Sequence, residues 1–537
     1  MRARFGGPSA CPGNVAALGM SSDARTLPLR KAPAGGAKDG HGRRLFSGRA
    51  RTLAGTNADV RTAALALVAI LALSLLVVVM AADRPSGFLP TTRTGFFPHW
   101  MAGPLGGLWP GLTRDGTTLR WLFSSLIVLM YGSYLVALKG TRQLPARWVI
   151  GAVIAAHAIF LLAPPLALTD VFNYINYGRM EVVHNLNPYT TIPVYEPHSD
   201  PSYALSNWHE LLSPYGPIFT LLTFAVVPLG VAASLWALKG ILMVTSLATI
   251  FLVWRCARLL GRDPVSAIAL VGLNPIVLVW GLGGVHNDFL MVFLIVLGFY
   301  LLLLSRERTA EGEQAHARRR SLSLRAAEIG AGAAFVTATG VKASAAILIP
   351  VVLVGLLRRP RALLDVVIGM LAAGAAVGAV SLLAFGLHIP DLSTQSRLVT
   401  SESVPNLIGL AVGAGGESET VRVIVSGALA ASVLLCCWMA WSRRWPAADR
   451  SVTASGWASV ALLVTLSWVL PWYVLWALPL AALSSSRRLR TTVLALGVYL
   501  IITWAPASGL LWSAIGFHPE KTSLGRLHQR YVKELLN

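Results

Sequence analysis

Long apolar runs recur along this chain between residues 62 and 512, and short clusters of Lys and Arg separate many of them. A helix needs about 20 mostly apolar residues to cross the hydrocarbon core of a bilayer. Charged residues make up 13% of the chain, against about 25% in ordinary soluble domains. Because only helices and closed barrels satisfy their backbone hydrogen bonds inside a bilayer, these runs predict an all-α polytopic membrane protein.

The net charge is +21, and the positions of the basic residues along the chain indicate the topology. Residues 1–62 hold eleven Lys and Arg against three acids, and most other basic residues lie in short connections. Cytoplasmic loops of membrane proteins carry such an excess, so we interpret the charge as topology and expect no nucleic-acid binding. Residues 1–60 are predicted to be a disordered basic tail on the cytoplasmic side.

The apolar stretch 216–232 decides the predicted topology. If it crossed the membrane, every later basic cluster, beginning with Arg255, Arg258 and Arg262, would face outside. It is about 17 residues long and contains Pro228, so we expect a half-helix or interfacial helix within a large outer loop over 167–235. This choice predicts about thirteen transmembrane helices within a domain over 61–512. The N-terminus is then cytoplasmic, and a short C-terminal tail over 513–537 lies outside.

The stretch 168–189, LTDVFNYINYGRMEVVHNLNPY, opens the predicted outer loop. Thr169 can cap a helix that begins at Asp170, and the residue before Pro188 is expected to end that helix. One face of the helix should carry Asp170, Tyr174, Tyr177 and Glu181. A carboxylate and two phenols beside a bilayer predict a site for a polar ligand.

Other ionisable residues converge on the same predicted outer face. Charged groups at membrane depth are costly, so such a gathering is a candidate functional site. The group comprises Glu181, His286, Asp288, Lys342, His388 and Arg397.

Simpler interpretations exist for several of these residues. Asp170 suits the first turn of a helix because of the helix dipole, and Tyr174 and Tyr177 suit a membrane interface. Arg179 can meet a lipid phosphate or an acid of the same loop. Lys342 can extend to headgroups or neutralise a bound phosphate.

An outward acid, an outward cation and aromatic side chains beside lipid suit glycosyl transfer from a lipid-phosphate-linked sugar. The polyprenyl phosphate is a good leaving group, so one carboxylate can act as general base on the acceptor hydroxyl. Cations can stabilise the departing phosphate. The sequence has no nucleotide-binding fingerprint in a suitable context, and its four cysteines predict neither a disulfide framework nor a metal cluster.

Several short motifs occur in one order between Asp170 and Pro350, and the chain resembles the GT-C superfamily of membrane glycosyltransferases through them. Within that superfamily it is similar to actinobacterial polyprenol-phosphomannose-dependent α-1,6-mannosyltransferases. The motifs are Asp170-Val171-Phe172-Asn173-Tyr174, Asn187-Pro188-Tyr189, Tyr215-Gly216-Pro217-Ile218, Asn274-Pro275, Gly283-Gly284-Val285-His286-Asn287-Asp288, and Lys342 ahead of Pro350.

The resemblance implies a GT-C-like helical bundle and an inverting transferase of the plasma membrane, with its active site on the outer face. Asp170 matches the catalytic base, and Asp288 matches a second acid near the phosphate or an ion. The donor would be a polyprenyl-phosphate sugar, with mannose as first choice, and the acceptor a lipoglycan or cell-wall glycan. Substrate contacts are predicted at Tyr174, Tyr177, Arg179, Tyr215, His286, Asp288, Lys342 and Arg397.

Two questions stay open from the sequence. A transporter or flippase of lipid-linked sugars is the alternative function, although such a protein should hold its ionisable residues near the membrane midplane. No metal ligands are predicted, yet two carboxylates would suit magnesium or manganese, so a divalent cation stays open as a cofactor.

Overall fold

The computed structural model describes residues 57–83, 97–108, 115–166, 169–312, 317–443 and 449–536, without the side chains of 57–58 and 307–321. These residues belong to one compact unit. The described part of the chain consists of helices and their connections and contains no strand, which confirms the all-α prediction. The predicted tail over 1–60 lies almost wholly outside it.

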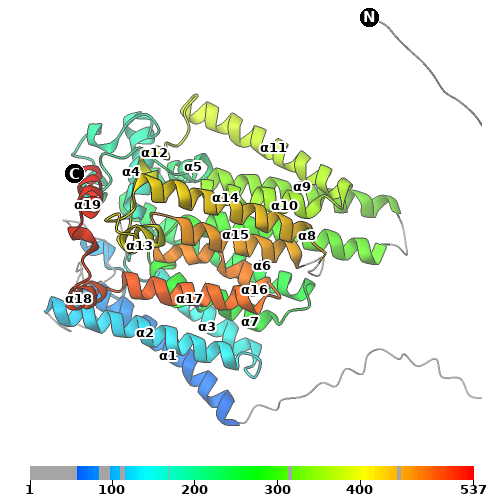
Figure 1. The fold of residues 1–537 in the computed structure, drawn as a ribbon, viewed down its shortest axis with the longest axis horizontal. Helices are drawn as coiled ribbons and strands as arrows, with labels where there is room; N and C mark the ends of the chain where they lie inside the picture. The colour runs from blue at the N-terminus through cyan, green and yellow to red at the C-terminus, as the bar shows by residue number, and fades with distance from the viewer. Residues whose placement is uncertain are drawn as a thin grey trace, which may run out of the picture. The chain divides into compact units, whose positions relative to one another are not determined.

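The first half of the chain builds one side of the bundle and a polar loop (Figure 1). Its helices and short 3-10 turns (η) are α1 (Asn57–Asp83), η1 (His99–Met101), α2 (Gly116–Gly140), α3 (Ala146–Leu161), α4 (Asp170–His184), η2 (Pro193–Tyr195), η3 (Tyr203–Leu205), α5 (Pro217–Val226), η4 (Val227–Leu229), α6 (Val231–Leu259), α7 (Pro264–Gly272), the π-helical segment η5 (Val277–Leu282) and α8 (Asp288–Gly312).

The second half completes the bundle and adds a helical C-terminal segment. Its elements are α9 (Ala317–Val341), η6 (Ala343–Ile347), α10 (Leu348–Leu356), α11 (Pro360–Phe385), α12 (Ser393–Ser396), α13 (Val404–Ala411), α14 (Glu419–Trp441), α15 (Arg450–Thr465), η7 (Pro471–Trp476), α16 (Leu478–Leu483), α17 (Arg487–Trp504), α18 (Ser508–Ala514), η8 (Pro519–Lys521) and α19 (Ser523–Leu535).

The long helices pack mainly against neighbours in sequence, as α1 with α2, α8 with α9, and α14 with α15 do. Helix α9 also packs on α11, and α8 on α6. Figure 1 shows α4, α12, α13 and α19 gathered at one end of these helices. The loop after α4 is tied to the end of α11 there, because the Asn187 side-chain amide donates to the Phe385 carbonyl at 2.9 Å.

Six helices of the described residues are long and apolar enough to cross a membrane: Asp59–Asp83, Gly116–Gly140, Val231–Leu259, Asp288–Arg306, Pro360–Phe385 and Glu419–Trp441. The bent pair α17 and α18 would make a seventh. The protein is therefore a helical membrane protein, but the predicted count of about thirteen spans is not confirmed. Several apolar stretches form short or broken helices, since α3 has 16 residues and the apolar stretch 265–281 divides into α7 and η5.

Four local predictions can be compared with the structure. Helix α4 does begin at Asp170, but its end is at His184, because Asn185 takes a left-handed conformation (φ 55°) that stops it before Pro188. The Thr169 side chain makes no cap and donates instead to the Asn207 side chain. Most of the stretch 216–232 forms the short helices α5 and η4, and its last two residues begin α6. Part of the predicted short tail folds into α19.

Candidate active site

A cavity of about 290 Å³ lies at the end of the bundle that α4 and α12 occupy. Aromatic and charged side chains from distant parts of the sequence form its wall. The residues are Asp170, Tyr174, Trp208, Leu211, Pro214, Tyr215, Asp288, Lys342, Ala343, Ser344, Leu392, Gln395, Ser396, Leu398, Leu466, Trp468, Leu470, Trp472, Tyr473 and Trp476. A concave site with few polar groups among aromatic ones is typical of ligand binding.

Asp170 is the first residue of α4, and its side chain is 13% exposed. Its Oδ2 lies 3.4 Å from Nδ1 of His286, which is longer than a good hydrogen bond. The fully buried His286 ring stacks on Trp472, with ring centroids 3.5 Å apart and planes 9° apart. The indole therefore fixes the imidazole beside the Asp170 carboxylate.

Asp288 and Lys342 form an ion pair at the cavity. The Lys342 amine donates to both Asp288 oxygens at 2.9 and 3.0 Å, and Trp476 Nε1 donates to Oδ1 at 2.5 Å. The amine also lies 4.6 Å from the Tyr473 ring centroid, a cation–π contact. Asp288 is 1% exposed and Lys342 21%, so the cation is the member of the pair that is more open to the cavity.

A break between α9 and η6 presents Lys342 to the cavity. Its backbone is extended (φ −152°, ψ 124°), and η6 follows directly. Gly216, just before α5, donates from its backbone to the Val341 carbonyl at 3.1 Å. A Cβ atom at Gly216 would lie 2.2 Å from the Gly340 carbonyl oxygen, so only glycine permits this approach. The motif Tyr215-Gly216-Pro217 therefore brings Tyr215 and Lys342 to one site.

Tyr174 forms part of the aromatic wall. Its ring meets Tyr215 and Phe219 edge-on, with centroids 4.7 and 4.8 Å apart. Burial, together with the charges of Asp170 and Asp288, raises the pKa of Tyr174 well above its usual value. The phenol therefore stays protonated at neutral pH and can serve as a hydrogen-bond donor.

The turn before α8 carries strain and unsatisfied polar atoms. Val285 has a positive φ of 59°, which is rare for a β-branched residue. Both ring nitrogens of His286 and both amide atoms of Asn287 are buried without a hydrogen-bond partner among the described residues. Strain and orphaned polar atoms of this kind cluster at functional sites.

The structure does not bring every predicted residue to the cavity. Tyr177 contacts Tyr215, and its hydroxyl donates to the Leu211 carbonyl at 2.6 Å, so it supports the wall from behind. Arg179 forms a bidentate pair with Asp200 and is not a lining residue. Arg397 is exposed beside lining residues of the α12 segment.

Four tryptophans line the cavity and are not among the predicted site residues, namely Trp208, Trp468, Trp472 and Trp476. The segment 471–476, PWYVLW, is a signal in the sequence, because it is rich in aromatic residues and begins with a proline. From the sequence alone, Trp472 and Tyr473 suit a membrane interface equally well. Only the fold shows that this segment lies against His286 and Lys342.

Metal binding has little support from the donor set. Among the described residues, no group of three or more His, Cys, Asp and Glu side chains is arranged to hold a metal ion. The Asp288 oxygens already accept from Lys342 and Trp476. The residues at the cavity therefore fit a carboxylate neutralised by lysine better than a carboxylate that ligates a divalent ion.

The cavity combines a carboxylate beside a histidine, a neutralising cation and an aromatic wall, on a membrane-type helical bundle. This combination suits a membrane glycosyltransferase. Comparison with known families agrees. Residues 87–358, half of the chain, match the family described as alpha-(1->6)-mannopyranosyltransferase, N-terminal domain, and residues 400–517 match the MptB C-terminal domain. The chain belongs to this alpha-(1->6)-mannopyranosyltransferase family and is a glycosyltransferase.

Two relatives that carry the name of this family have moderate sequence identity to the chain. Alpha-(1->6)-mannopyranosyltransferase A of Mycobacterium tuberculosis is 28% identical over 384 residues, which cover 65% of this chain and 68% of that protein. Alpha-(1->6)-mannopyranosyltransferase A of Corynebacterium glutamicum is 30% identical over 154 residues, 27% of this chain and 30% of that protein. No solved structure matches this chain significantly.

Proposed function

We propose that this protein transfers mannose from a polyprenyl-phosphate donor to a hydroxyl group of a lipoglycan or cell-wall glycan. The supporting observation is the placement of Asp170 and the Lys342–Asp288 pair on one aromatic-walled cavity. The names of the relatives support mannose as the sugar and a 1→6 linkage.

In the proposed reaction, the acceptor hydroxyl attacks the anomeric carbon of mannose from the side opposite the phosphate. A new C–O bond to the acceptor forms as the bond from the anomeric carbon to the phosphate oxygen breaks, and the configuration inverts. Asp170 takes the hydroxyl proton, and the polyprenyl phosphate leaves as an anion beside the Lys342 amine. His286 lies 3.4 Å from Asp170 and acts as a positioning residue.

The location of the cavity suits a donor held in a membrane. Asp288 lines the cavity and is also the first residue of a candidate span, Asp288–Arg306. The site thus lies at the end of that span, where a phosphate attached to a lipid would be. We propose that this end faces the outside of the plasma membrane, because the basic clusters lie at the other end and such clusters favour the cytoplasm.

We propose that transfer needs no divalent cation, since Lys342 already supplies the positive charge at Asp288. Membranes treated with a chelator should keep their activity. A loss that magnesium or manganese restores would contradict this proposal and favour the metal alternative.

The decisive test of the base is Asp170→Asn, which keeps the shape of the side chain and removes its basicity. We expect transfer from radiolabelled polyprenyl-phosphate mannose to fall by at least about 10²-fold, the lower range of general-base effects. Asp115→Asn is the matched control, because Asp115 caps α2 at an exposed position and asparagine is an equally good cap. Full activity of the Asp170→Asn protein would exclude Asp170 as the base.

The donor is tested by a panel of polyprenyl-phosphate sugars carrying mannose or arabinose, with a nucleotide-linked mannose beside them. We expect incorporation only from polyprenyl-phosphate mannose. Movement of a lipid-linked sugar across vesicle membranes without any transfer would instead support the transporter alternative.

A further inference from the structure

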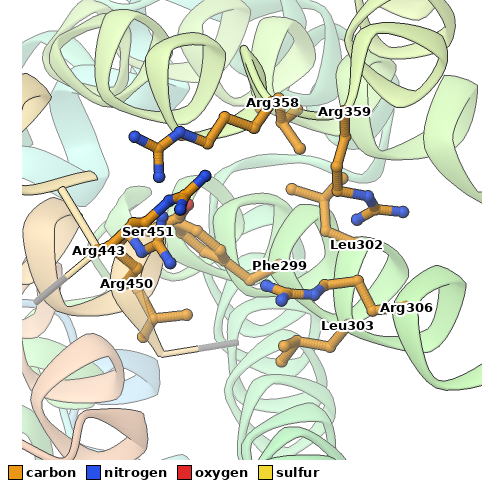
Figure 2. A pocket seen from close by; sticks show the side chains of 12 residues that line it. Phe299, Leu302, Leu303, Arg306, Arg358, Arg359, Arg443, Arg450 and Ser451 are labelled. Carbon is orange, nitrogen blue, oxygen red and sulfur yellow. The ribbon is translucent and has the colours of Figure 1, made fainter. Parts of the chain in front are cut away.

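A second cavity, of about 360 Å³, lies where α8, the α10–α11 connection and the start of α15 meet. Five arginines belong to its wall: Arg306, Arg358, Arg359, Arg443 and Arg450. Figure 2 shows Arg358 and Arg359 extending from one stretch of chain, with Arg443 and Arg450 on one side of Phe299 and Arg306 on the other. The catalytic proposal uses none of these residues.

Two arginines of this cluster have defined partners. Arg359 pairs with Glu328 at 3.0 Å, while Arg358 lies over the Trp441 ring, 4.9 Å from its centroid. Two guanidinium nitrogens, Arg359 Nη1 and Arg450 Nε, are buried without a hydrogen-bond partner among the described residues. Guanidinium groups bind phosphate through paired hydrogen bonds, so the cavity has the donors of a phosphate site.

The remaining wall of the cavity is apolar. Phe299, Leu302 and Leu303 of α8 contribute to it, together with Leu356 and Val452. A soluble phosphate gains nothing from such a surface, whereas a lipid chain attached to a phosphate does.

The cavity also lies where candidate membrane spans end. Arg306 is the last residue of the span Asp288–Arg306, Arg359 directly precedes Pro360–Phe385, and Arg443 closely follows Glu419–Trp441. Along α8 the distance from Asp288 to Arg306 is about 27 Å at 1.5 Å per residue, close to the thickness of a bilayer's hydrocarbon core. The arginines therefore lie at the membrane surface opposite the catalytic cavity.

We propose that this second cavity binds the phosphate of an anionic membrane lipid, with the guanidinium groups around the phosphate and the lipid chain against α8. Basic pockets between membrane helices are suited to such headgroups. The site is separate from the catalytic cavity, so the proposal holds or fails independently of the sugar that is transferred.

The test measures lipid binding to the purified full chain in detergent by native mass spectrometry, with phosphatidylglycerol and with phosphatidylcholine of the same acyl chains. We expect phosphatidylglycerol to bind more tightly, and Arg358→Gln with Arg443→Gln to weaken it about thirtyfold. Arg358→Lys with Arg443→Lys keeps the charge and should retain most of the binding. Arg487→Gln with Arg488→Gln removes the same charge from exposed positions outside the cavity and should change little.

Inorganic phosphate distinguishes a lipid from a soluble ion. If it displaces phosphatidylglycerol at similar concentrations, the site binds free anions and the lipid proposal is overturned. The proposal also fails if both lipids bind alike, or if the Arg487 and Arg488 control loses as much binding as the cavity variant. Unchanged binding in the folded Arg358 and Arg443 glutamine variant would overturn it as well.

Discussion

Lys342 has two tasks at the cavity, because it neutralises a buried carboxylate and presents a charge to the proposed phosphate. Lys342→Met would leave Asp288, which is 1% exposed, without its cation. We expect a loss of about 3 to 5 kcal/mol in apparent stability, as for other broken buried ion pairs. Transfer should be lost too. Thermal unfolding in detergent and the transfer assay measure the two effects.

A second substitution separates the two tasks of Lys342. Adding Asp288→Asn to Lys342→Met removes the unpaired charge, so stability should recover while transfer stays absent. Recovery of transfer in the double variant would show that Lys342 acts only through folding. Lys342→Arg, which keeps the charge, serves as the control.

Glu196 lies in the loop after α4. Because of this residue, we expect the stability of the protein to depend on pH. Burial, with a contribution from the Asp200 charge, raises the pKa of Glu196 to about 8, although Asn176 and Arg179 act in the opposite direction. At pH values between the usual pKa of a glutamate and about 8, Glu196 keeps its proton in the folded protein and loses it in the unfolded chain. The free energy of unfolding therefore falls as pH rises.

Glu196→Gln should therefore stabilise the protein at pH 7.5 by about 1 to 2 kcal/mol, because the loop is partly open to water and screening reduces the effect. Below the usual pKa both proteins should unfold at the same temperature. Glu534→Gln, at an exposed position of α19, should show no such pH dependence. If Glu196→Gln raises the stability equally at all pH values, its effect comes from side-chain packing and not from the ionisation of Glu196.

Some residues of the proposed site could be identified from the sequence alone, and others could not. Asp170, His286, Asp288 and Lys342 were predicted because ionisable residues beside apolar runs are expensive and therefore noticeable. Arg179 has the same signature, yet it pairs with Asp200 within the loop. Sequence alone cannot tell a structural ion pair from a ligand contact, because that difference depends on where residue 200 folds back.

Among the elements, α4 was predicted well at its start and less well at its end. Its first turn follows from the position of Asp170 after an apolar run, whereas its end depends on the left-handed conformation of Asn185. Helix α19 was not predicted at all. It is polar overall, and its apolar side chains are explained only by what they pack on.

Helix α19 covers part of the wall of the proposed catalytic cavity. Leu535 packs with Trp208, Leu211 and Leu398, which line the cavity, and the Glu210 backbone amide donates to the Leu535 carbonyl at 3.3 Å. Leu535→Ala should weaken the docking of α19 by about 2 to 4 kcal/mol. We expect trypsin to cleave α19 at least about tenfold faster and transfer to decrease.

The control lies on the same helix. Leu527 is 51% exposed, so Leu527→Ala should alter neither proteolysis nor transfer. If Leu535→Ala speeds cleavage but leaves transfer unchanged, then α19 covers the site without shaping it.

At the scale of the whole molecule, composition and apolar runs were sufficient to predict a helical membrane protein. The number of spans was not predictable in the same way. Breaks such as Lys342 between α9 and η6, or Asn274-Pro275 between α7 and η5, interrupt apolar stretches that look continuous by hydropathy. The break at Lys342 also presents that residue to the cavity, so one feature that hides the number of spans from hydropathy helps to build the site.

The orientation of the bundle gives the last prediction. Ser199 is exposed in the loop after α4, and Ser323 is exposed in α9, whose other end reaches Lys342. Ser323 lies 19 residues before Lys342, about 28 Å along the helix, so the two positions should be on opposite sides of the membrane. In a chain carrying Cys11→Ser, a membrane-impermeant maleimide should label Ser199→Cys in intact cells. It should label Ser323→Cys only after permeabilisation.

Cys256, Cys436 and Cys437 are buried and should give little background. The reverse labelling would place the catalytic cavity in the cytoplasm, where a soluble nucleotide-linked sugar is within reach and the need for a membrane-held donor disappears. Labelling of both positions in intact cells would mean that the two ends of α9 do not lie on opposite sides. The proposed catalytic cavity and the arginine cavity would then not lie at opposite membrane surfaces.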